Sequence, residues 1–428
     1  MRRKKDNLSF LGVELTGGLE EKMTAWGGAS LLVELGRRCG AIQMAERVLP
    51  KKRTGKGLRQ GQMVESFVLL SALGGECIEG MERLRGDEGL AAILEYVPPA
   101  AETARQWLGR FHDEAVMAER PEQGSFLPKE SGALAGLREV NRRVIWAYTE
   151  AVDTGLDVTL DVDAQLVETS KRDARYCYEG YKAFQPMEVE WAETKLVLAE
   201  EFREGNVPAS KDIERMVDAA YEMLPVNEWR VKVRSDSAAY EQDNLDHWDQ
   251  KGWQFAVSAD MSVQLRTVIE ALPGESWKLW KEERKGIIRE WAEVPYVPTR
   301  KPEQKGALPY RYVAIRIRKQ QMEMFEDGSR VRHFAITSNI WGMEGQKLLE
   351  WHRGKAGTIE HIHHILDNEL AAGVYPSAKH GANAAWLRLQ VITHNLLELL
   401  KAVARYPQSM PKPGQKGSDL PSSPSLGA

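Results

Sequence analysis

The stretch Asp157-Val-Thr-Leu-Asp-Val-Asp-Ala-Gln-Leu-Val167 alternates polar and apolar side chains, and this alternation decides the fold class. A period of two predicts a β-strand with one buried face. Residues two apart on a strand point to the same face, so Asp161 and Asp163 share one environment. Neighbouring carboxylates repel each other unless a proton or a cation lies between them. The stretch therefore predicts a sheet that carries a polar site.

Strands and helices alternate around this stretch. The pattern predicts strands at residues 230–235 and 253–258, and a strand or a strand plus a turn at residues 191–202. It predicts helices at residues 138–152, 210–224, 241–252, 344–370 and 383–405. Such alternation is typical of an α/β core. We therefore expect an α/β fold, in which polar residues that follow neighbouring strands meet at one edge of the sheet.

Residues 264–340 interrupt this alternation. They contain three strand-like runs, at residues 291–297, 310–319 and 331–338. The last two runs bracket Glu326-Asp-Gly-Ser329, which is a good hairpin turn. We expect a β-strand insertion domain within the α/β core.

The N-terminal part of the chain has a helical pattern. Apolar residues three and four apart predict helices at residues 60–96 and 102–117. The entry Pro98-Pro-Ala-Ala-Glu-Thr103 resembles the turn before a DNA-reading helix, and Arg105 and Arg110 lie on the helix that follows. An ordinary bundle helix is the alternative. We expect an N-terminal helical domain.

Changes in composition divide the chain into six expected segments. They are an N-terminal helical DNA-binding region (1–120), a linker (121–137), the first part of the core (138–263), the β insertion (264–340), the second part of the core (341–405) and a disordered tail (406–428). The linker and the tail are rich in residues that favour turns or disorder.

The composition argues against several classes of protein. The hydrophobic fraction of 43% is enough for buried cores. No apolar stretch approaches the roughly 20 residues needed to cross a bilayer, and no apolar segment of a signal peptide follows the charged first residues. The three cysteines, Cys39, Cys77 and Cys177, have neither a zinc spacing nor a disulfide pattern. We expect a cytoplasmic protein without a membrane partner.

The net charge of −4 conceals two basic regions. Residues 1–60 contain 13 Lys and Arg against 6 Asp and Glu, and residues 295–320 contain 7 against 1. Basic surfaces attract nucleic-acid phosphates, although a solvated surface is the alternative for either region alone. The expected DNA-binding residues are Arg105, Arg110, Arg300, Lys301, Lys305, Arg311, Arg316, Arg318, Lys319, Arg353 and Lys355.

Two further acids can join the aspartates of the first strand. Asp236 follows the predicted strand 230–235, and Glu360 lies on the predicted helix 344–370. Three converging carboxylates suit hard divalent cations such as Mg²⁺ or Mn²⁺. Two such ions roughly 3.5–4 Å apart activate a nucleophile and stabilise the leaving oxygen in phosphodiester displacement. Each acid alone says little, because a lone Asp at a strand end is more often a cap.

Several motifs occur together in this chain. They are Leu84-Arg-Gly-Asp87, Leu160-Asp-Val-Asp-Ala164, Tyr178-Glu-Gly-Tyr-Lys-Ala-Phe-Gln-Pro186, Arg234-Ser-Asp-Ser-Ala-Ala-Tyr240, Gly357-Thr-Ile-Glu-His-Ile-His363 and Gly381-Ala-Asn-Ala-Ala-Trp386. With them the sequence resembles the DDE transposases of bacterial insertion sequences. Within that group it is most similar to the insertion-sequence thirteen-eighty family of the insertion-sequence-four-like superfamily.

The resemblance implies a ribonuclease-H-like catalytic core that uses two Mg²⁺ or Mn²⁺ ions. It implies that Asp163, Asp236 and Glu360 are the catalytic acids and metal ligands, with Asp161 as a rival for the first position. The implied reaction is cleavage at transposon ends followed by strand transfer. The implied partners are the terminal inverted repeats and target DNA, both double-stranded, bound by a homodimer.

Two positions depart from the family pattern. The threonine expected two residues after the first acid is Gln165, and the basic residue expected seven residues after the glutamate is Asp367. These departures leave open a catalytically decayed relative that only binds DNA.

A zinc-dependent hydrolase is the alternative enzyme. On a continuous helix, Glu360, His363, His364 and Asp367 would share one face, because their offsets are 0, 3, 4 and 7. Imidazole and carboxylate groups suit zinc. The absence of an H-E-x-x-H motif argues against this alternative.

Overall fold

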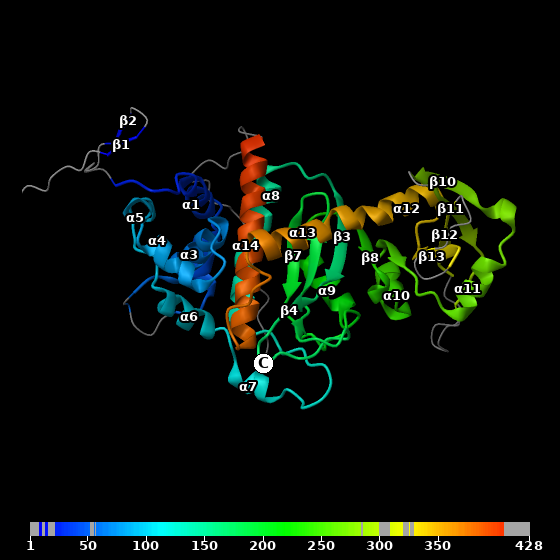
Figure 1. Cartoon of the computed structure of the whole chain (residues 1–428), viewed down its shortest axis with the longest axis horizontal. Helices are drawn as coiled ribbons and strands as arrows, with labels where there is room; N and C mark the ends of the chain where they lie inside the picture. The colour runs from blue at the N-terminus through cyan, green and yellow to red at the C-terminus, as the bar shows by residue number, and fades with distance from the viewer. Residues whose placement is uncertain are drawn as a thin grey trace, which may run out of the picture.

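The computed structural model describes residues 8–10, 13–15, 22–51, 55, 57–283, 286–298, 309–319, 325 and 329–405. A group of short N-terminal helices, a pair of long helices and a large sheet lie side by side along the long axis of the molecule (Figure 1). Two short strands, β1 (Leu8–Phe10) and β2 (Val13–Leu15), pair antiparallel before the first helix. The tail expected at residues 406–428 lies outside the described residues.

The N-terminal helices are shorter than the sequence pattern predicts. They are α1 (Ala29–Arg38), α2 (Ala41–Val48), α3 (Gln60–Ala72), α4 (Met81–Arg85), α5 (Glu88–Leu94), α6 (Ala101–Gly109) and α7 (Glu114–Ala118). Residues 60–96 are helical as predicted and are divided into α3, α4 and α5, because Gly74 adopts a φ of +78° after α3 and Asp87 caps a new helix through the backbone N–H of Leu90. The single helix predicted over residues 102–117 is wrong, because Asp113 caps α7.

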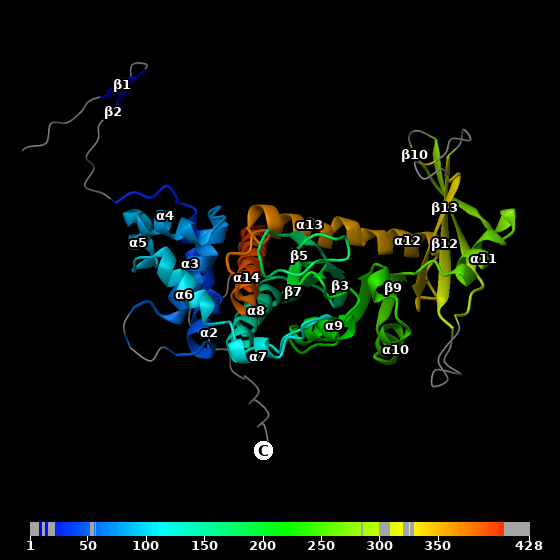
Figure 2. The same cartoon turned by 60° about the horizontal axis from the view of Figure 1, so that its bottom comes forward.

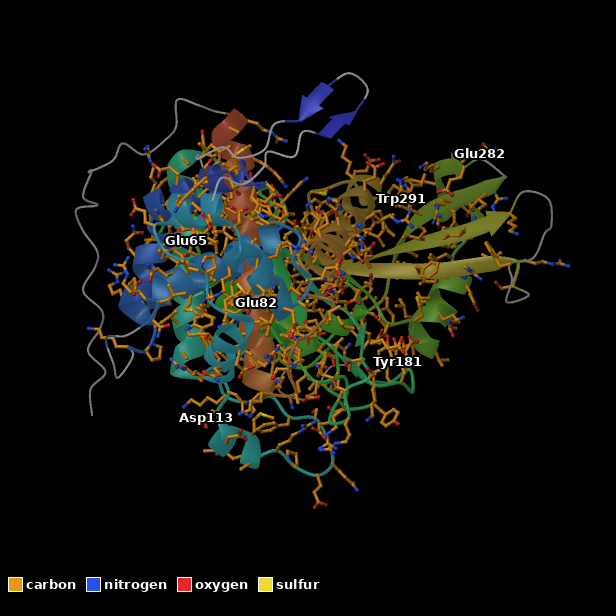
Figure 3. The ribbon with its side chains drawn as sticks, turned by 60° about the vertical axis from the view of Figure 1, so that its left-hand side comes forward. Glu65, Glu82, Asp113, Tyr181, Glu282 and Trp291 are labelled. Carbon is orange, nitrogen blue, oxygen red and sulfur yellow. The ribbon has the colours of Figure 1, made fainter. Side chains whose placement is uncertain are left out.

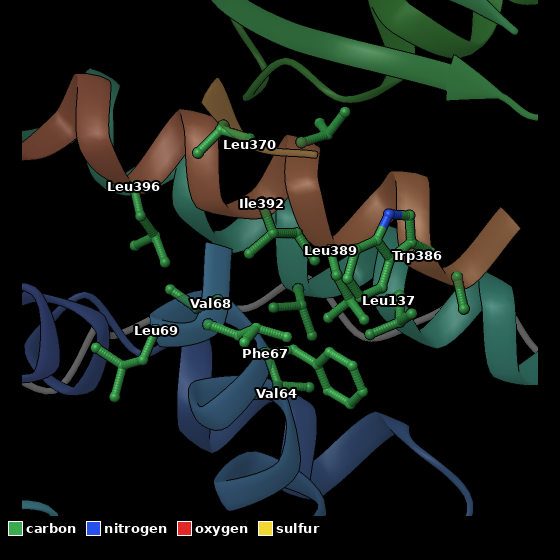
Figure 4. Packing of buried hydrophobic residues seen from close by; sticks show 14 of the residues in the cluster. Val64, Phe67, Val68, Leu69, Leu137, Leu370, Trp386, Leu389, Ile392 and Leu396 are labelled. Carbon is green, nitrogen blue, oxygen red and sulfur yellow. The ribbon is translucent and has the colours of Figure 1, made fainter. Parts of the chain in front are cut away.

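Two long helices that pack side by side in parallel connect the N-terminal helices to the sheet, with Arg388 near Leu134 and Asn395 near Asn141. They are α8 (Gly132–Ala151) and α14 (His380–Arg405). Ser131 caps α8 through the backbone N–H of Leu134, so this helix begins within the segment expected to be a linker. Figure 4 shows the buried side chains of Phe67 on α3, Leu137 on α8 and Leu389 on α14 in one cluster. Burial of this apolar surface from three elements joins them into one core.

The three cysteines form no disulfide bond in the structure. All three cysteines are free, with Cys39 and Cys177 buried and Cys77 exposed. Burial raises the pKa of the Cys39 thiol to about 11, so this residue packs as a small apolar group. In the described part of the chain, no helix is both long and apolar enough to span a bilayer.

The large sheet confirms the α/β prediction. Its strands are β3 (Asp157–Ala164), β6 (Met187–Trp191), β7 (Leu196–Glu201), β8 (Arg230–Ser235), β9 (Gln254–Ser258), β10 (Lys278–Glu283), β11 (Ile287–Val294), β12 (Arg311–Lys319) and β13 (Val331–Ser338). Their order is β10-β11-β12-β13-β9-β8-β3-β6-β7. Only the β3–β8 and β8–β9 neighbours are parallel among these described strands.

The two faces of the sheet differ in polarity. Val158, Leu160 and Val162 of β3 are buried in an apolar cluster with α9 (Ile213–Glu222) and α10 (Gln242–Gln250). The alternate residues Asp161 and Asp163 point to the other face, which α12 (Gly345–Arg353) and α13 (Ile359–His364) cross. Figure 2 shows the strands between these two pairs of helices. The polar face is therefore covered by the segment that carries the third predicted acid.

The structure tests the sequence predictions at residues 191–202, at β10 and at residues 344–370. At residues 191–202 the alternative of a strand plus a turn is confirmed, because a turn with Lys195 at a φ of +63° reverses the chain between β6 and β7. The strand β10 has no counterpart in the prediction. The helix predicted at residues 344–370 is broken into α12, a 3₁₀ turn at Gly354–Gly357, α13 and a π-helical turn at Ile365–Glu369.

The strands predicted as an insertion are continuous with the core sheet. β12 and β13 form the expected antiparallel pair, and β13 also pairs with β9, so that Ile336 lies opposite Ser258. Residues 326–328 of the predicted hairpin turn lie outside the described residues. Helix α11 (Val263–Glu270) packs with Trp277 and Tyr312 against one face of these strands. Backbone hydrogen bonds thus connect the basic strands directly to the core.

A buried amide fastens α14 to the outer strand β7. The side chain of Asn395 accepts a hydrogen bond from the backbone N–H of Val197 at 2.9 Å and donates to the carbonyl of the same residue at 2.8 Å. The Asn395 amide also donates to Asn141 of α8 at 2.8 Å. β7 is the last strand of the sheet, so its outer backbone groups have no neighbouring strand to pair with. The Asn395 side chain forms hydrogen bonds with two of these groups.

We expect Asn395→Leu to lower the free energy of unfolding by about 1–3 kcal/mol, because it leaves the backbone N–H of Val197 buried without a partner. Thr393→Val is the control. Thr393 is equally buried, but its hydroxyl only donates to the carbonyl of Leu389 on its own helix. Denaturant unfolding of both variants measures the difference, and equal losses would contradict the proposed role of the amide.

Candidate functional site

Two predicted acids lie at the ends of neighbouring parallel strands. β3 and β8 pair in register, with Val162 opposite Ser235 at the carboxyl end of the ladder. The next residues are Asp163 and Asp236, which therefore lie beside each other at one edge of the sheet. Asp163 is half-buried and Asp236 is exposed. With Glu360 they form what we call the acidic edge.

Asp236 is held by the turn that follows its strand. Its Oδ1 atom accepts a hydrogen bond from the backbone N–H of Ala238 at 3.1 Å, at the start of the 3₁₀ turn Ser237–Ala239. The preceding carbonyl, of Ser235, lies 3.0 Å from Nε2 of His352 on α12. Burial lowers the pKa of His352 to about 4, so this histidine is a neutral donor at physiological pH.

Arg234 connects the end of α12 to β8. Its Nη1 atom donates to the carbonyl of Trp351 at 2.5 Å, and its guanidinium lies over the ring of the same residue. Gly354 permits this approach, because a Cβ atom at that position would lie 2.5 Å from Nη1 of Arg234. The helix break after α12 is thus shaped around the arginine.

Two contacts fasten the start of α13 to β3. The hydroxyl of Thr358 donates to Asp161, and Nζ of the buried Lys355 lies 3.2 Å from Oδ2 of Asp163. Glu360 follows in the first turn of α13 and is exposed. The contacts therefore bring the segment that carries Glu360 to the strands that carry the two aspartates.

The acidic edge is not a closed cluster. In the part of the chain that the structure describes, one set of three His, Cys, Asp or Glu residues offers ligand atoms within 4.8 Å of one another: Glu214, Asp218 and His247. These residues lie on α9 and α10, across the sheet from α13 (Figure 2). His247 contacts the two carboxylates through different ring nitrogens, and Lys251 also contacts Asp218 at 2.7 Å. Asp218 of this set is thus already paired with the ammonium group of Lys251.

Asp161 has a structural environment. It is fully buried, and its two oxygens accept hydrogen bonds of 2.6 Å from Nε and Nη2 of Arg234. The hydroxyl of Thr358 donates to the same carboxylate. These donors occupy both oxygens of Asp161.

Two buried glutamates of β6 were missed by the sequence analysis. Glu190 lies opposite Asp161 and Glu188 lies opposite Asp163 across the β3–β6 ladder. Burial, followed by the charge of Asp161, raises the pKa of Glu190 to about 8, so this glutamate carries a proton at neutral pH. The stretch Met187-Glu-Val-Glu-Trp191 has the same alternation as β3, and this signal could have revealed the pair.

Glu188 lies next to the acidic edge without a hydrogen-bond donor. Among the described residues, neither of its oxygens has a hydrogen-bond partner, although Nε2 of His363 lies 3.3 Å from Oε2. Burial alone would lower the pKa of His363, but its contact with Glu188 raises it above the usual value. The contact therefore favours the charged form of His363 beside this buried side chain.

The two departures from the family pattern contact each other. The amide of Gln165 donates to Oδ1 of Asp367 at 3.3 Å. Burial, followed by the charge of Glu188, raises the pKa of Asp367 to about 6. Asp367 lies half-buried within the π-helical turn, whereas Glu360 is exposed on α13. The two acids consequently do not present one continuous helix face.

The structure also separates the residues of the zinc alternative. His363 is buried against Glu188, whereas His364 is exposed and its Nδ1 lies 3.1 Å from the amide of Asn368. Together with Glu360 and Asp367, these histidines do not form a set of closely spaced ligands among the described residues. Glu360, His363 and His364 lie on α13, whereas Asp367 lies in the π turn that follows it, so the continuous helix predicted to carry all four is interrupted before Asp367.

The predicted DNA-binding residues fall into three groups. Arg311 and Lys355 are buried, and they pair with Glu293 and Asp163. The residues with at least partial exposure are Arg105, Arg110, Arg316, Arg318, Lys319 and Arg353. Arg300, Lys301 and Lys305 lie outside the described residues. Burial removes the first group from the surface that a DNA strand can contact.

Comparisons with known proteins give one family and one structural likeness of note. The family model described as "Transposase DDE domain group 1" matches residues 11–412. The solved structures include a similar chain from the cryo-EM structure of the piggyBac transposase synaptic complex with hairpin DNA. That likeness has a TM-score of 0.46 and 8% sequence identity, over 89% of this chain and 76% of the other. No curated protein matches the sequence.

We expect Arg234→Met to lower the free energy of unfolding by about 3–5 kcal/mol, because it leaves the carboxylate of Asp161 buried without its cation. The double change Arg234→Met with Asp161→Leu should recover most of this loss. Arg230→Met is the matched control, because Arg230 and Asp157 form the same cross-strand pair at the exposed start of β3 and β8. Additive losses in the double variant, measured by denaturant unfolding, would contradict the ion pair.

We expect Asp367→Asn to stabilise the protein at pH 7.5 but not at pH 4. The folded state raises the pKa of this carboxyl from 3.8 to about 6, so the stability of the wild type falls as the pH rises through that interval. Asparagine carries no such charge. Melting temperatures of both proteins from pH 4 to pH 8 test this, and a difference that does not vary with pH would disprove it.

Proposed function

The chain belongs to the transposase DDE domain group 1 family, and from this premise we propose that Asp163, Asp236 and Glu360 are its catalytic acids. The family implies an enzyme that cleaves or transfers DNA strands. We propose in addition that the acids hold two Mg²⁺ or Mn²⁺ ions, and that the enzyme cleaves transposon ends and joins them to target DNA. Assignment to the insertion-sequence thirteen-eighty family is part of this proposal.

The strand order supports a ribonuclease-H-like core. The five strands β7-β6-β3-β8-β9 begin with two antiparallel neighbours and end with two parallel ones. In such a core the first strand lies in the middle, and the first acid lies on it. Here that strand is β3, which carries Asp163. The remaining strands extend this core through the pairing of β13 with β9.

The observation that carries the proposal is the placement of the acids. Asp163 and Asp236 each follow a residue of the last in-register pair of β3 and β8. They therefore lie at the carboxyl ends of two parallel strands, where sites of α/β proteins form. Glu360 follows the segment that Arg234 and Thr358 fasten to the same strands. These contacts support a common site for acids that are 73 and 124 positions apart in the sequence.

The donor set fits hard divalent cations. It consists of carboxylate oxygens, which Mg²⁺ and Mn²⁺ prefer. Asp236 and Glu360 are exposed, while Asp163 is half-buried with the Lys355 ammonium 3.2 Å away. When bound, two metal ions would activate a water or 3′-hydroxyl nucleophile and stabilise the leaving oxygen. The chain itself contributes the orientation of the acids, because Arg234 fixes the strands and the helix that carry them.

DNA is the proposed partner, as terminal inverted repeats and as target. Arg316 and Arg318 of β12 both pair with Glu290, and Arg316 lies 4.2 Å from the ring of Trp277. These side chains stand on strands that continue the core sheet, so phosphates bound there would be held at a fixed distance from the acidic edge. A homodimer on paired DNA ends is part of the same proposal.

We expect Asp236→Asn and Glu360→Gln each to lower Mg²⁺-dependent nicking of end DNA by at least about a hundredfold, while DNA binding changes little. The physical reason is that these exposed acids serve cations rather than phosphates. Supercoiled-plasmid nicking and binding to labelled duplex measure the two activities separately. Asp218→Asn, which alters the paired acid on α9, should leave nicking unchanged.

Nicking at the wild-type rate by either variant of the acidic edge would contradict the assignment. A wild-type protein that binds DNA but does not nick it with Mg²⁺ or Mn²⁺ would instead support the catalytically decayed relative. Restoration of a chelated protein by zinc alone would favour the zinc hydrolase.

A further inference from the structure

The ribbon of β3 and β6 continues beyond the acidic edge. Past the pair of Asp163 and Glu188, the strands β4 (Val167–Glu168) and β5 (Ala183–Phe184) pair antiparallel. The backbone N–H of Thr169 then donates to the carbonyl of Lys182 at 2.9 Å. Residues 169–182 form a hairpin on this extension, and we call it the tyrosine hairpin. At about 3.3 Å per residue, its base lies on the order of 20 Å from Asp163 along the ribbon.

Backbone contacts order the tip of the tyrosine hairpin. Tyr176 and Lys182 form an antiparallel bridge, and the N–H of Cys177 donates to the carbonyl of Tyr181 at 2.8 Å. Gly180 closes the turn with a φ of +88°, and its N–H donates to the carbonyl of Cys177. The side chain of Cys177 is buried. The tip is therefore an ordered turn, with an inner side that carries the buried Cys177 and an outer side.

The base of the tyrosine hairpin is packed against the body of the protein. Ala174 is buried in the main apolar cluster. The ring of Phe184 packs on those of Phe202 and Tyr375, with centroids 4.8 and 5.2 Å away. The N–H of Gly205 donates to the carbonyl of Ala183 at 2.9 Å, and a Cβ atom on Gly205 would lie 2.4 Å from that oxygen. These contacts fix the direction in which the hairpin leaves the sheet.

The outer side presents aromatic rings to solvent. Tyr178 is 79% exposed and Tyr176 is 64% exposed. Figure 3 shows the neighbouring Tyr181 at the surface, on the side away from the N-terminal helices. The hairpin also carries four cations against two acids: Lys171, Arg172, Arg175 and Lys182 against Asp173 and Glu179. Nζ of Lys182 lies 5.8 Å from the ring centre of Tyr176.

Exposed planar rings beside cations suit an unpaired nucleic-acid strand. Aromatic side chains stack on the faces of unpaired bases, and cations contact the phosphates between them. Within a duplex, both faces of each base are covered by the neighbouring base pairs. A duplex therefore leaves few base faces on which such rings can stack. Burial of the rings would also remove apolar surface from water.

We propose that the tyrosine hairpin binds an unpaired DNA strand beyond the acidic edge, with Tyr176 and Tyr178 stacked on its bases. The inference rests on the proposed function, because that function supplies DNA at this edge. It goes beyond that function by assigning a strand-binding role to a hairpin that contains none of the catalytic acids.

The test uses the full chain and two fluorescent oligonucleotide probes, without divalent metal so that no cleavage occurs. One probe is a blunt duplex, and the other is the same duplex with an unpaired thymine overhang. We expect the wild type to bind the overhang probe more tightly. The double variant Tyr176→Ala with Tyr178→Ala should lose about tenfold in affinity for the overhang probe and little for the blunt duplex.

The matched control is Tyr176→Phe with Tyr178→Phe, which keeps both rings and should bind as the wild type does. The slope of log affinity against log salt should be the same in all three proteins, because stacking releases no counterions. Melting temperatures verify that the variants are folded, which is expected because the altered side chains are exposed.

Alanine and wild-type proteins that bind the overhang probe equally well would overturn the inference while leaving the proposed function intact. Equal losses on both probes would also overturn it, because the hairpin would then contact duplex DNA. A wild type that binds neither probe and nicks no plasmid would overturn the proposed function, and the inference with it.

Discussion

The buried ion pair between Arg234 of β8 and Asp161 of β3 is the interaction on which the acidic edge depends. A guanidinium has five N–H donors in a rigid plane, and here two meet the carboxylate while a third meets the carbonyl of Trp351. The carboxylate also accepts the hydroxyl of Thr358. One pair therefore aligns two parallel strands and fastens both ends of the helix break that precedes Glu360. Removal of either partner would leave a buried charge unpaired.

The charge on the polar face of the sheet is compensated residue by residue. Asp161 has Arg234, Asp163 has Lys355, Glu188 has His363, and Glu190 keeps a proton because its pKa is raised to about 8. Neutralisation of the buried acids leaves Asp236 and Glu360 as exposed carboxylates at the edge. The proposed metal site combines these two exposed acids with the half-buried Asp163, which lies 3.2 Å from Lys355.

The sheet extends beyond the proposed site in two directions. β13 joins the strands of the expected insertion to β9, and the ribbon of β3 and β6 extends in another direction into the tyrosine hairpin. Backbone hydrogen bonds resist bending more than a flexible linker does, so both extensions hold a defined position relative to the acids. Cations and aromatic rings lie on each extension, with Arg316 over Trp277 on one and Lys182 near Tyr176 on the other.

The sequence by itself determined the features that depend on local periodicity. The strand at residues 230–235 and the shared face of Asp161 and Asp163 follow from a period of two, which the chain near each residue imposes. Tertiary structure decided what that period leaves open. It made Asp161 a structural acid, because Arg234 is its neighbour only across a strand pair, and it broke the predicted helix at Gly354, where Arg234 fills the space of a side chain. It also paired Gln165 with Asp367, which are 202 residues apart, because long-range contacts depend on how elements pack rather than on the pattern within any one of them.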